Sequence, residues 1–408
     1  PSSSATRRRP KPNGLSLPQE SPFISLLSMN IAFDAKRITH NATGLGNYSR
    51  FVLDMLTEYR PENRYLLFSP STGNPALYKS LLSHRSVRLI TPHRALAFAG
   101  GNIWRNFSVP RQCRTHQVDL FHGLTNELPV GLYRAQRVGT VVTIHDLAFI
   151  RYPQFYKPID RLLYRKKYGA SARHADHVIT VSDQTRRDVI DIFGVDEDRV
   201  TTVYQGCSEA FARVTPEDER LARQALNLPE RYILFVGSIE ERKNLALIVE
   251  ALAQLQDKDI HLVAIGRKTP YVQTVVDRAR RLGVLSRVHL LHGVGSLLLP
   301  GVYAGAKVFV YPSRFEGFGI PLIEALNAGI PVIGATGSCL EEAGGPSSLY
   351  TDPNDATMLS ALIDRVLIDI SLRRKMIEEG RTYVERFSPK RLAKDLSSVY
   401  ENVLLTYE

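Results

Sequence analysis

The sequence predicts an α/β fold of two tandem doubly wound domains, each with a parallel sheet, facing a central cleft. The chain has 408 residues, which is enough for two or three domains of ordinary size. Short apolar runs alternate with amphipathic stretches along most of its length, and this alternation is typical of parallel sheets covered by helices. A turn-like and then charged stretch, residues 205–230, interrupts the alternation once, near the middle.

The first half of the chain supplies candidate strands from Met29 onward. These strands are expected at 31–33, 65–68, 87–90, 120–122, 138–144, 178–181 and 200–203, with helical patterns at 47–57 and 183–192. Residues 1–28 are rich in Ser, Pro and Arg and show no period, so we expect a disordered extension rather than a targeting signal.

The second half repeats the rhythm, with strands expected at 233–236, 262–265, 288–291, 308–311 and 332–333. We therefore expect an N-terminal domain at 29–205 and a C-terminal domain at 206–388. The last amphipathic segment, 389–408, is followed by no strand, and we expect it to cross back to the N-terminal domain. In folds of this type the carboxyl ends of the strands line the ligand crevice.

Composition narrows the classes of partner. Lys and Arg number 52 against 41 Asp and Glu, which gives a formal net charge of +11 and favours an anionic partner. No nucleic-acid recognition motif is present, so we expect no nucleic-acid partner. No apolar run reaches the ~18 residues of a membrane span. The three cysteines, Cys113, Cys207 and Cys339, lie far apart without metal-ligand spacing, as is typical of a reducing cytoplasm.

The densest motif is residues 311–333, which predict a buried strand, a loop with two glycines and a helix opened by a proline. This pattern places Glu316 in the loop and Glu324 one turn into the helix. A helix N-terminus beside glycines offers backbone N–H groups to an anion, and a nearby carboxylate can accept hydrogen bonds from a ribose or sugar diol. From residue chemistry alone, an ordinary surface glutamate or a helix-dipole partner explains these residues equally well.

The motif resembles the signature of the retaining nucleotide-sugar glycosyltransferases of the large family four, whose two Rossmann-like domains form the architecture called GT-B. The matching residues are Pro312, Ser313, Glu316, Gly317, Phe318, Gly319, Pro321, Glu324, Ala325, Ala328, Gly329, Pro331 and Val332. The resemblance covers nearly all of 29–408. It implies that Glu316 contacts the donor sugar, that Glu324 contacts the nucleotide ribose, and that Gly317, Phe318 and Gly319 belong to the donor site.

Residues 236–244 resemble the family's loop for the donor diphosphate. In this resemblance Arg242 and Lys243 neutralise the leaving diphosphate, and two adjacent cations ahead of a helix are also a physically sound anion site. Ser238 stands in the same loop where many members have an Arg. Val294, after the strand at 288–291, matches the place of the base-binding loop, although a plain turn would look the same.

Two motifs of the first domain complete the expected site. Gly44 and Gly46 resemble the family's glycine-rich loop before its first long helix, where they would let backbone approach a phosphate or sugar; a tight turn explains them equally well. His145 follows the strand at 138–144 and resembles a histidine that hydrogen-bonds the donor sugar near the reacting carbon. A lone histidine is more often structural, but its place at a strand's carboxyl end favours function.

Two further acidic features are expected to be non-catalytic. Glu342 lies in a small-residue stretch and is interpreted as a turn or supporting residue. The acid-x-acid motifs at 196–198 and 257–259 sit in polar turns, so solvated charge is favoured over a metal site. The family architecture needs no metal, and we expect neither metal nor cofactor besides the donor.

The resemblance implies metal-independent transfer of a hexose, with retention, from a nucleotide diphosphate sugar to a glycan or lipid-linked acceptor, as in polysaccharide and lipopolysaccharide biosynthesis. The Arg-Lys-Asn form of the diphosphate loop resembles that of mannosyltransferases and points to GDP-mannose. The alternative is a catalytically silent nucleotide-sugar-binding partner subunit. The presence of His145, Lys243 and Glu316 together argues against that alternative.

Two basic stretches with interleaved aromatic residues indicate where an anionic membrane surface could bind. The first comprises Arg85, Arg88, Arg94, Arg105, Arg111 and Arg114 with Phe98, Trp104 and Phe107. The second comprises Arg151, Lys157, Arg161, Arg165, Lys166, Lys167 and Arg173 with Tyr152, Phe155, Tyr156, Tyr164 and Tyr168. A solvated helix that covers the sheet explains them as well. The expected location is cytoplasmic, peripheral at the inner face of the membrane.

Overall fold

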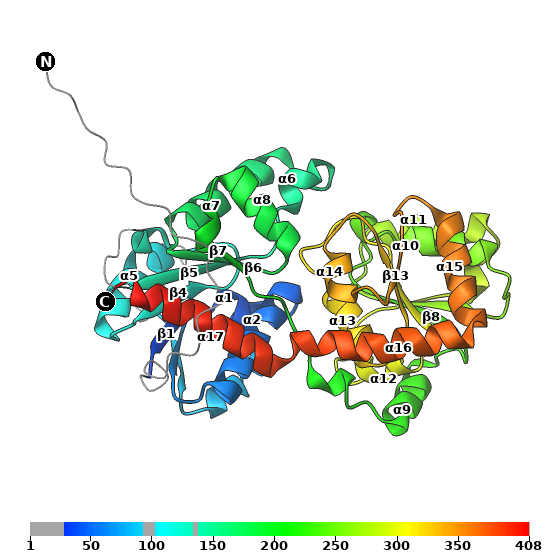
Figure 1. Ribbon diagram of the computed structural model, residues 1–408, viewed down its shortest axis with the longest axis horizontal. Coiled ribbons are helices and arrows are strands. Elements are labelled where there is room, and N and C mark those ends of the chain that lie inside the picture. The colour runs from blue at the N-terminus through cyan, green and yellow to red at the C-terminus, as the bar shows by residue number, and fades with distance from the viewer. Residues whose placement is uncertain (1–27, 93–102, 134–137, 408) are drawn as a thin grey trace, which may run out of the picture.

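The computed structural model describes residues 28–92, 103–133 and 138–407. It has two α/β lobes side by side, each built on a fully parallel sheet (Figure 1). The predicted fold class is therefore confirmed. The expected extension, apart from Ser28, lies outside the described residues, as do Arg94 and Phe98 of the first basic stretch.

The first lobe is a seven-stranded sheet with the order β3-β2-β1-β4-β5-β6-β7. Its strands are β1 (Asn30–Asp34), β2 (Arg64–Phe68), β3 (Val87–Ile90), β4 (Leu120–Gly123), β5 (Gly139–Ile144), β6 (His177–Thr180) and β7 (Val200–Thr202). The helices between them include α1 (Lys36–His40), α2 (Gly44–Tyr59), α5 (Val109–Thr115), α6 (Ala148–Arg151), α7 (Pro158–His174) and α8 (Asp183–Phe193). Buried side chains on both faces of β1, β4 and β5 form the core, as expected of a sheet covered on both sides.

The second lobe is a six-stranded sheet with the order β10-β9-β8-β11-β12-β13. Its strands are β8 (Tyr232–Val236), β9 (His261–Ile265), β10 (Val288–Leu291), β11 (Val308–Tyr311), β12 (Val332–Ala335) and β13 (Leu349–Thr351). Its helices are α9 (Pro216–Leu226), α10 (Leu245–Gln254), α11 (Tyr271–Arg281), α12 (Leu299–Ala304), α13 (Ile320–Asn327), α14 (Leu340–Gly344), α15 (Ala356–Ile368) and α16 (Ile370–Val384).

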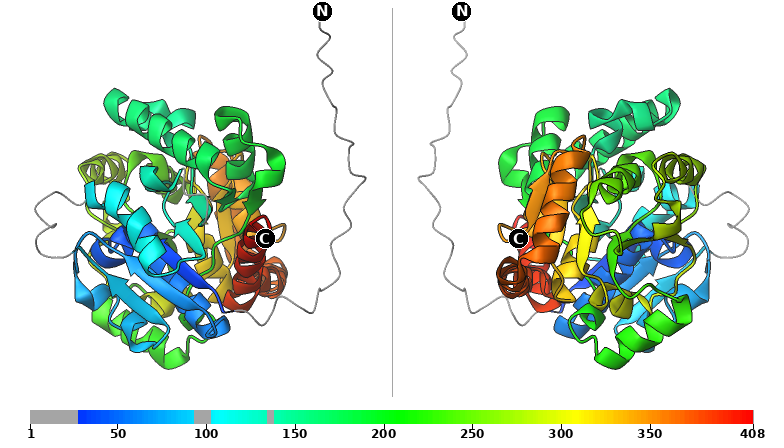
Figure 2. Two further views of the ribbon diagram at one scale, coloured as in Figure 1. Left: turned by 90° about the vertical axis from the view of Figure 1, so that its left-hand side faces the viewer. Right: turned by 90° about the vertical axis from the view of Figure 1, so that its right-hand side faces the viewer.

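The last helix, α17 (Pro389–Leu405), continues from α16 of the second lobe and lies against the first lobe (Figure 1). Its buried residues, such as Leu392 and Tyr400, belong to the core formed around β1, β4 and α2. The views of Figure 2 show the same placement at the edge of both lobes. The chain thus crosses between the lobes twice, once after β7 and once between α16 and α17. The boundary at residue 205 stays a prediction, and the two sheets lie on either side of it.

Two expectations about elements were incomplete. The strand β13 was not among the expected strands, because Leu349–Thr351 is only three residues long and two of them are partly exposed. The first long helix begins at Gly44 rather than at 47, so Gly44 and Gly46 form its first turn instead of a preceding loop. None of the described helices is both long enough and apolar enough to cross a bilayer.

Candidate functional site

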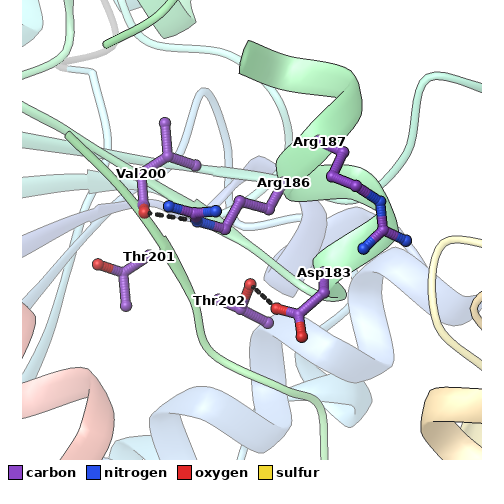
Figure 3. A pocket seen from close by; sticks show the side chains of 6 residues that line it. All are labelled: Asp183, Arg186, Arg187, Val200, Thr201 and Thr202. Carbon is purple, nitrogen blue, oxygen red and sulfur yellow. Dashed lines mark hydrogen bonds between the residues drawn. The ribbon is translucent and has the colours of Figure 1, made fainter. Parts of the chain in front are cut away.

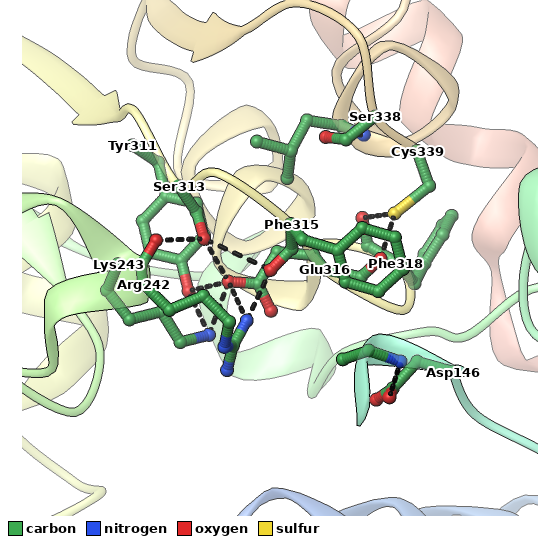
Figure 4. A network of polar contacts seen from close by, with 12 residues as sticks. Asp146, Arg242, Lys243, Tyr311, Ser313, Phe315, Glu316, Phe318, Ser338 and Cys339 are labelled. Carbon is green, nitrogen blue, oxygen red and sulfur yellow. Dashed lines mark hydrogen bonds and ion pairs between the residues drawn. The ribbon is translucent and has the colours of Figure 1, made fainter. Parts of the chain in front are cut away.

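The site is centred on the carboxylate of Glu316, in the loop that follows β11 (Figure 4). Four polar groups contact the same oxygen, Oε1. They are Lys243 Nζ at 2.5 Å, Ser313 Oγ at 2.6 Å, the Tyr311 hydroxyl at 3.1 Å and an Arg242 guanidinium nitrogen at 3.2 Å. Lys243 also donates to the Tyr311 hydroxyl at 2.7 Å. All four contacts reach Oε1, so these groups leave the other oxygen, Oε2, unengaged.

The pKa values of the cluster are set by the burial of one anion, Glu316, beside two cations, Lys243 and Arg242. Burial would raise the pKa of Glu316, but the charges of Lys243 and Arg242 outweigh it and lower the pKa to about 2. Burial lowers the pKa of Lys243, against the attraction of Glu316. Burial also acts to lower the pKa of Arg242, but the charge of Glu316 together with those of its other neighbours outweighs burial and raises it. The three side chains carry one net positive charge, which is a suitable environment for a diphosphate.

Local structure explains why Arg242 and Lys243 reach the loop. They lie on a 3₁₀ turn, Glu241–Lys243, that follows β8, and Asn244 ends the turn with φ +62°. The Asn244 side chain donates to the carbonyl oxygens of Pro312 at 3.2 Å and Pro353 at 2.7 Å. The bond to Pro312 fastens the cationic turn to the loop that carries Glu316, and the bond to Pro353 fastens it to the segment after β13.

Glu324 lies on α13, one turn beyond the helix start, as the spacing predicted. The Tyr303 hydroxyl, on α12, donates to its Oε2 at 2.7 Å. Burial raises the pKa of Glu324 to about 7, and the bond from Tyr303 offsets only part of that rise. The Glu324 carboxyl is therefore poised to gain hydrogen-bond donors, such as a diol, that would stabilise its ionised form.

His145 follows β5 and is buried, with 6% of its surface exposed. Its Nε2 lies 2.8 Å from the carbonyl oxygen of Leu124, and the Gln205 amide nitrogen lies 3.1 Å from its Nδ1. Burial lowers its pKa, so the ring is neutral, with Nε2 protonated toward the carbonyl. The edge of the Tyr48 ring packs on it at 4.6 Å between centroids. Both ring nitrogens thus have partners, and contact with a donor sugar stays a prediction.

The two lobes meet beside His145. A Cβ on Gly317 would lie 2.3 Å from the His145 carbonyl oxygen, so this close approach requires glycine. The rings of Tyr152 and Phe315 pack 5.3 Å apart across the same boundary. Residues at the carboxyl ends of β5 and β11 are therefore brought together, as the predicted arrangement requires.

Phe318 and Gly319 support the loop from behind. The Phe318 ring is buried and stacks on Tyr204 at 5.4 Å and packs edge-on against Phe387 at 5.3 Å. The Phe318 side chain therefore fills the core, and its place in the donor site stays a prediction. Gly319 has φ +139° and precedes α13, a conformation that other residues rarely adopt.

The remaining predicted donor residues are divided between the two domains. Ser238 and Val294 follow β8 and β10 at the same edge of the second sheet. Val294 packs partly against the core of that domain. In the first domain a Cβ on Gly46 would lie 1.8 Å from the Asn41 carbonyl oxygen, whereas one on Gly44 would meet nothing. The packing of α2 against 37–41 thus explains Gly46 without a ligand.

Sequence reasoning missed several residues of the site. Tyr311 and Ser313 stand in the recognised motif, and their closeness to Glu316 was the available signal. No sequence signal pointed to Tyr303 or Gln205. Tyr303 contacts Glu324, and Gln205 contacts His145, from other segments of the chain.

The acid-x-acid motifs lie apart from this site. Asp196 precedes a short turn of the first domain, and Asp257 pairs with Arg231 at 2.6 Å in the second. Within the described ranges, no group of three His, Cys, Asp or Glu side chains is arranged to hold a metal ion.

A surface pocket of about 480 Å³ lies between α8 and β7, lined by Asp183, Arg186, Arg187, Val200, Thr201 and Thr202 (Figure 3). The pocket includes none of the Glu316 cluster.

Two family models match the chain, one on each lobe. The model described as "Glycosyltransferase Family 4" matches residues 49–211, and that described as "Glycosyl transferases group 1" matches residues 217–383. The second match contains Arg242, Lys243, Glu316 and Glu324.

Similar proteins are known by sequence and by structure. O-antigen chain mannosyltransferase B of Escherichia coli is 30% identical over 379 residues, which cover 88% of this chain and 96% of that protein. Serotype-specific mannosyltransferase WbdA of E. coli is 28% identical over 335 residues, 79% of this chain and 40% of that protein. Anabaena Alr3699/HepE, solved in complex with UDP and glucose, has a TM-score of 0.73 at 19% identity, covering 92% of this chain and 100% of that one.

Proposed function

Because the chain belongs to the group 1 glycosyltransferases of family 4, we propose that it transfers a hexose from a nucleotide diphosphate sugar to a glycan or lipid-linked acceptor. The observation that carries the proposal is the cluster in which Arg242, Lys243 and Glu316 meet beside the junction of the lobes. The mannosyltransferase relatives favour mannose as the sugar. The Arg-Lys-Asn form of the diphosphate loop favours GDP-mannose as the donor. The first of these relatives acts on the O-antigen chain, which favours an O-antigen acceptor.

Each residue has a defined part in the proposed reaction. Arg242 and Lys243 neutralise the diphosphate as the bond from the anomeric carbon to its oxygen breaks, which is the largest electrostatic contribution. Glu316 holds the sugar and aligns the two cations, and Glu324 accepts hydrogen bonds from the ribose diol. A departing phosphate oxygen takes the acceptor proton as the new bond forms on the same face. The configuration is thereby retained, without a metal ion.

A donor panel tests this function. GDP-mannose at about 100 times its dissociation constant should stabilise the protein by about 2.7 kcal/mol in a thermal-shift assay. UDP-glucose, UDP-galactose and GDP alone serve as comparisons. Transfer to an O-antigen acceptor should proceed in EDTA, because cationic side chains carry the diphosphate. Binding without transfer to any acceptor would favour the silent partner subunit. Loss of transfer in EDTA with recovery in Mn²⁺ would contradict metal independence.

We also propose that α7 docks the first domain on an anionic membrane. Of the aromatic residues expected to contribute, Tyr164 and Tyr168 lie on this helix, and both are partly buried. Their rings pack against Phe149, with ring centroids 5.7 and 5.5 Å away. The exposed apolar residues are Ile159, Leu162 and Leu163, at 62%, 65% and 46% exposure. They neighbour the exposed basic residues Arg165, Lys166 and Lys167. Apolar and basic groups on one helix suit the membrane interface.

Liposome flotation tests the docking. Recovery should be higher with anionic than with neutral vesicles, since each Lys or Arg near an anionic surface contributes about 1 kcal/mol. It should fall as salt shortens the Debye length from about 10 Å toward about 3 Å. Reversing the charges of Arg165, Lys166 and Lys167 should abolish flotation. Reversal of Arg373, Arg374 and Lys375, a matched basic run on α16, should not. Equal recovery on both kinds of vesicle would refute the docking.

A further inference from the structure

A second connection between the lobes lies at the N-terminus of α8. Glu342, on α14 of the second domain, extends its carboxylate to the first domain. Its Oε2 accepts a hydrogen bond from the Asp183 backbone N–H at 2.7 Å, and its Oε1 accepts one from the Gln184 N–H at 3.0 Å. The first N–H groups of a helix have no partner within that helix, and a negative charge there is favoured. The first turn of α8 is therefore completed by a carboxylate from the other domain.

Both ends of this connection are tied to the candidate site. Directly before α14, the Cys339 thiol donates to the carbonyl oxygens of Glu316 at 3.0 Å and Phe318 at 3.1 Å. On α8, the Thr185 hydroxyl donates to the His145 carbonyl oxygen at 3.3 Å. We call the set Cys339, Glu342, Asp183, Gln184 and Thr185 the α14–α8 bridge. It links the loop of Glu316 to the backbone of His145 by hydrogen bonds between segments and by the helical backbone within α14 and α8.

The α8 end of the bridge is held firmly in its own domain. The Ser182 hydroxyl accepts from the Thr185 N–H at 3.1 Å, which is an N-cap. The Asp183 carboxylate accepts from the hydroxyls of Thr202 at 2.6 Å and Tyr204 at 3.2 Å, and Figure 3 shows the first of these bonds beside the pocket. Burial raises the pKa of Glu342, while the two backbone donors act to lower it. A shift of one domain against the other would stretch the bonds of Glu342, because α8 belongs to the first domain and α14 to the second.

We propose that Glu342 is a positioning residue that holds the two domains in register, so that His145 faces the loop of Glu316. The proposal rests on the proposed transferase function for its catalytic consequence. Glu342 touches no reacting atom in this view. It acts through α8 and α14. It keeps the His145 carbonyl oxygen beside Gly317, where the two backbones approach so closely that a Cβ would not fit.

Hydrogen exchange on the intact protein tests the bridge without any substrate. First-turn amides of a helix are ordinarily open to exchange, so we expect the bonds to Glu342 to protect those of Asp183 and Gln184. In Glu342→Ala both amides should exchange at least about tenfold faster, since charge-assisted hydrogen bonds are among the stronger ones. Glu342→Gln should give an intermediate rate. Glu341→Ala is the matched control, because the Glu341 carboxylate bonds Thr336 at 2.6 Å within its own domain.

Turnover then tests the positioning role. In Glu342→Ala, kcat should fall about tenfold while nucleoside diphosphate affinity stays within about twofold, because Glu324, Arg242 and Lys243 are untouched. Glu341→Ala should leave both unchanged. Unaltered exchange at Asp183 and Gln184 in a folded Glu342→Ala variant would overturn the bridge. Faster exchange with full turnover would overturn the positioning role. Absence of transfer by the unsubstituted protein with every donor would refute the proposed function alone, because the exchange measurement needs no donor.

Discussion

Replacing Glu316 by Gln is expected to lower turnover by about 100-fold or more while nucleoside diphosphate binds at least as tightly. The carboxylate Oε1 gathers Lys243, Arg242, Ser313 and Tyr311, so its loss misplaces both cations relative to the breaking bond. Misplacement of about 1 Å can cost about 100-fold in rate. The variant also leaves two cations without their anion, and an added diphosphate would neutralise them. Initial rates and isothermal titration with GDP would measure the two effects.

Stability needs its own control in this experiment. Removing one member of a buried charge pair costs about 3–5 kcal/mol, since the other charges stay buried without compensation. The double variant Glu316→Gln, Lys243→Met restores the original net charge of the cluster. It should recover much of the stability but none of the turnover. Full activity in either variant would contradict the assignment of Glu316 to the reaction.

Replacing Glu324 by Gln is expected to stabilise the free protein at about pH 8 but not at about pH 5. The pKa of Glu324 is raised from 4.5 to about 7, so between these values the folded state holds a proton that the unfolded state has lost. Stability therefore falls as pH rises from about 4.5 to about 7 and is level above that. With allowance for partial exposure, the loss is about 2–3 kcal/mol. Gln does not ionise and avoids this loss.

The same substitution should lower the affinity for the nucleotide sugar about tenfold at pH 8, because a charge-assisted hydrogen bond to the ribose is lost. Affinity of the unsubstituted protein should rise between about pH 6 and pH 8 as Glu324 ionises. Urea unfolding and titration at both pH values provide the measurements, with Glu378→Gln on the exposed face of α16 as control. An equal stability change at both pH values, or unchanged affinity, would contradict the role of Glu324.

The sequence by itself determined the architecture and the centre of the site. Twofold repetition of apolar runs predicted two parallel sheets, because a strand buried on both faces must be apolar throughout, wherever it pairs. The spacing of Glu316 and Glu324 around Pro321 predicted a loop and a helix start, because capping and proline geometry are local. These features depend on residues near one another in the chain, so they can be predicted from the sequence without knowing the tertiary structure.

Only the tertiary structure decided which groups act on one another. Glu342 reaches Asp183 across 159 positions of sequence, Lys243 reaches Glu316 across 73, and Gln205 reaches His145 across 60. The Phe318 ring packs in the core against Tyr204. Gly46 is required by its close approach to the Asn41 carbonyl oxygen, because close packing sets the surroundings of each residue. No local pattern records such pairings, since each depends on how two separate segments are packed. The ring contacts of His145, the pKa of Glu324 and the bridge between the domains arise at that level.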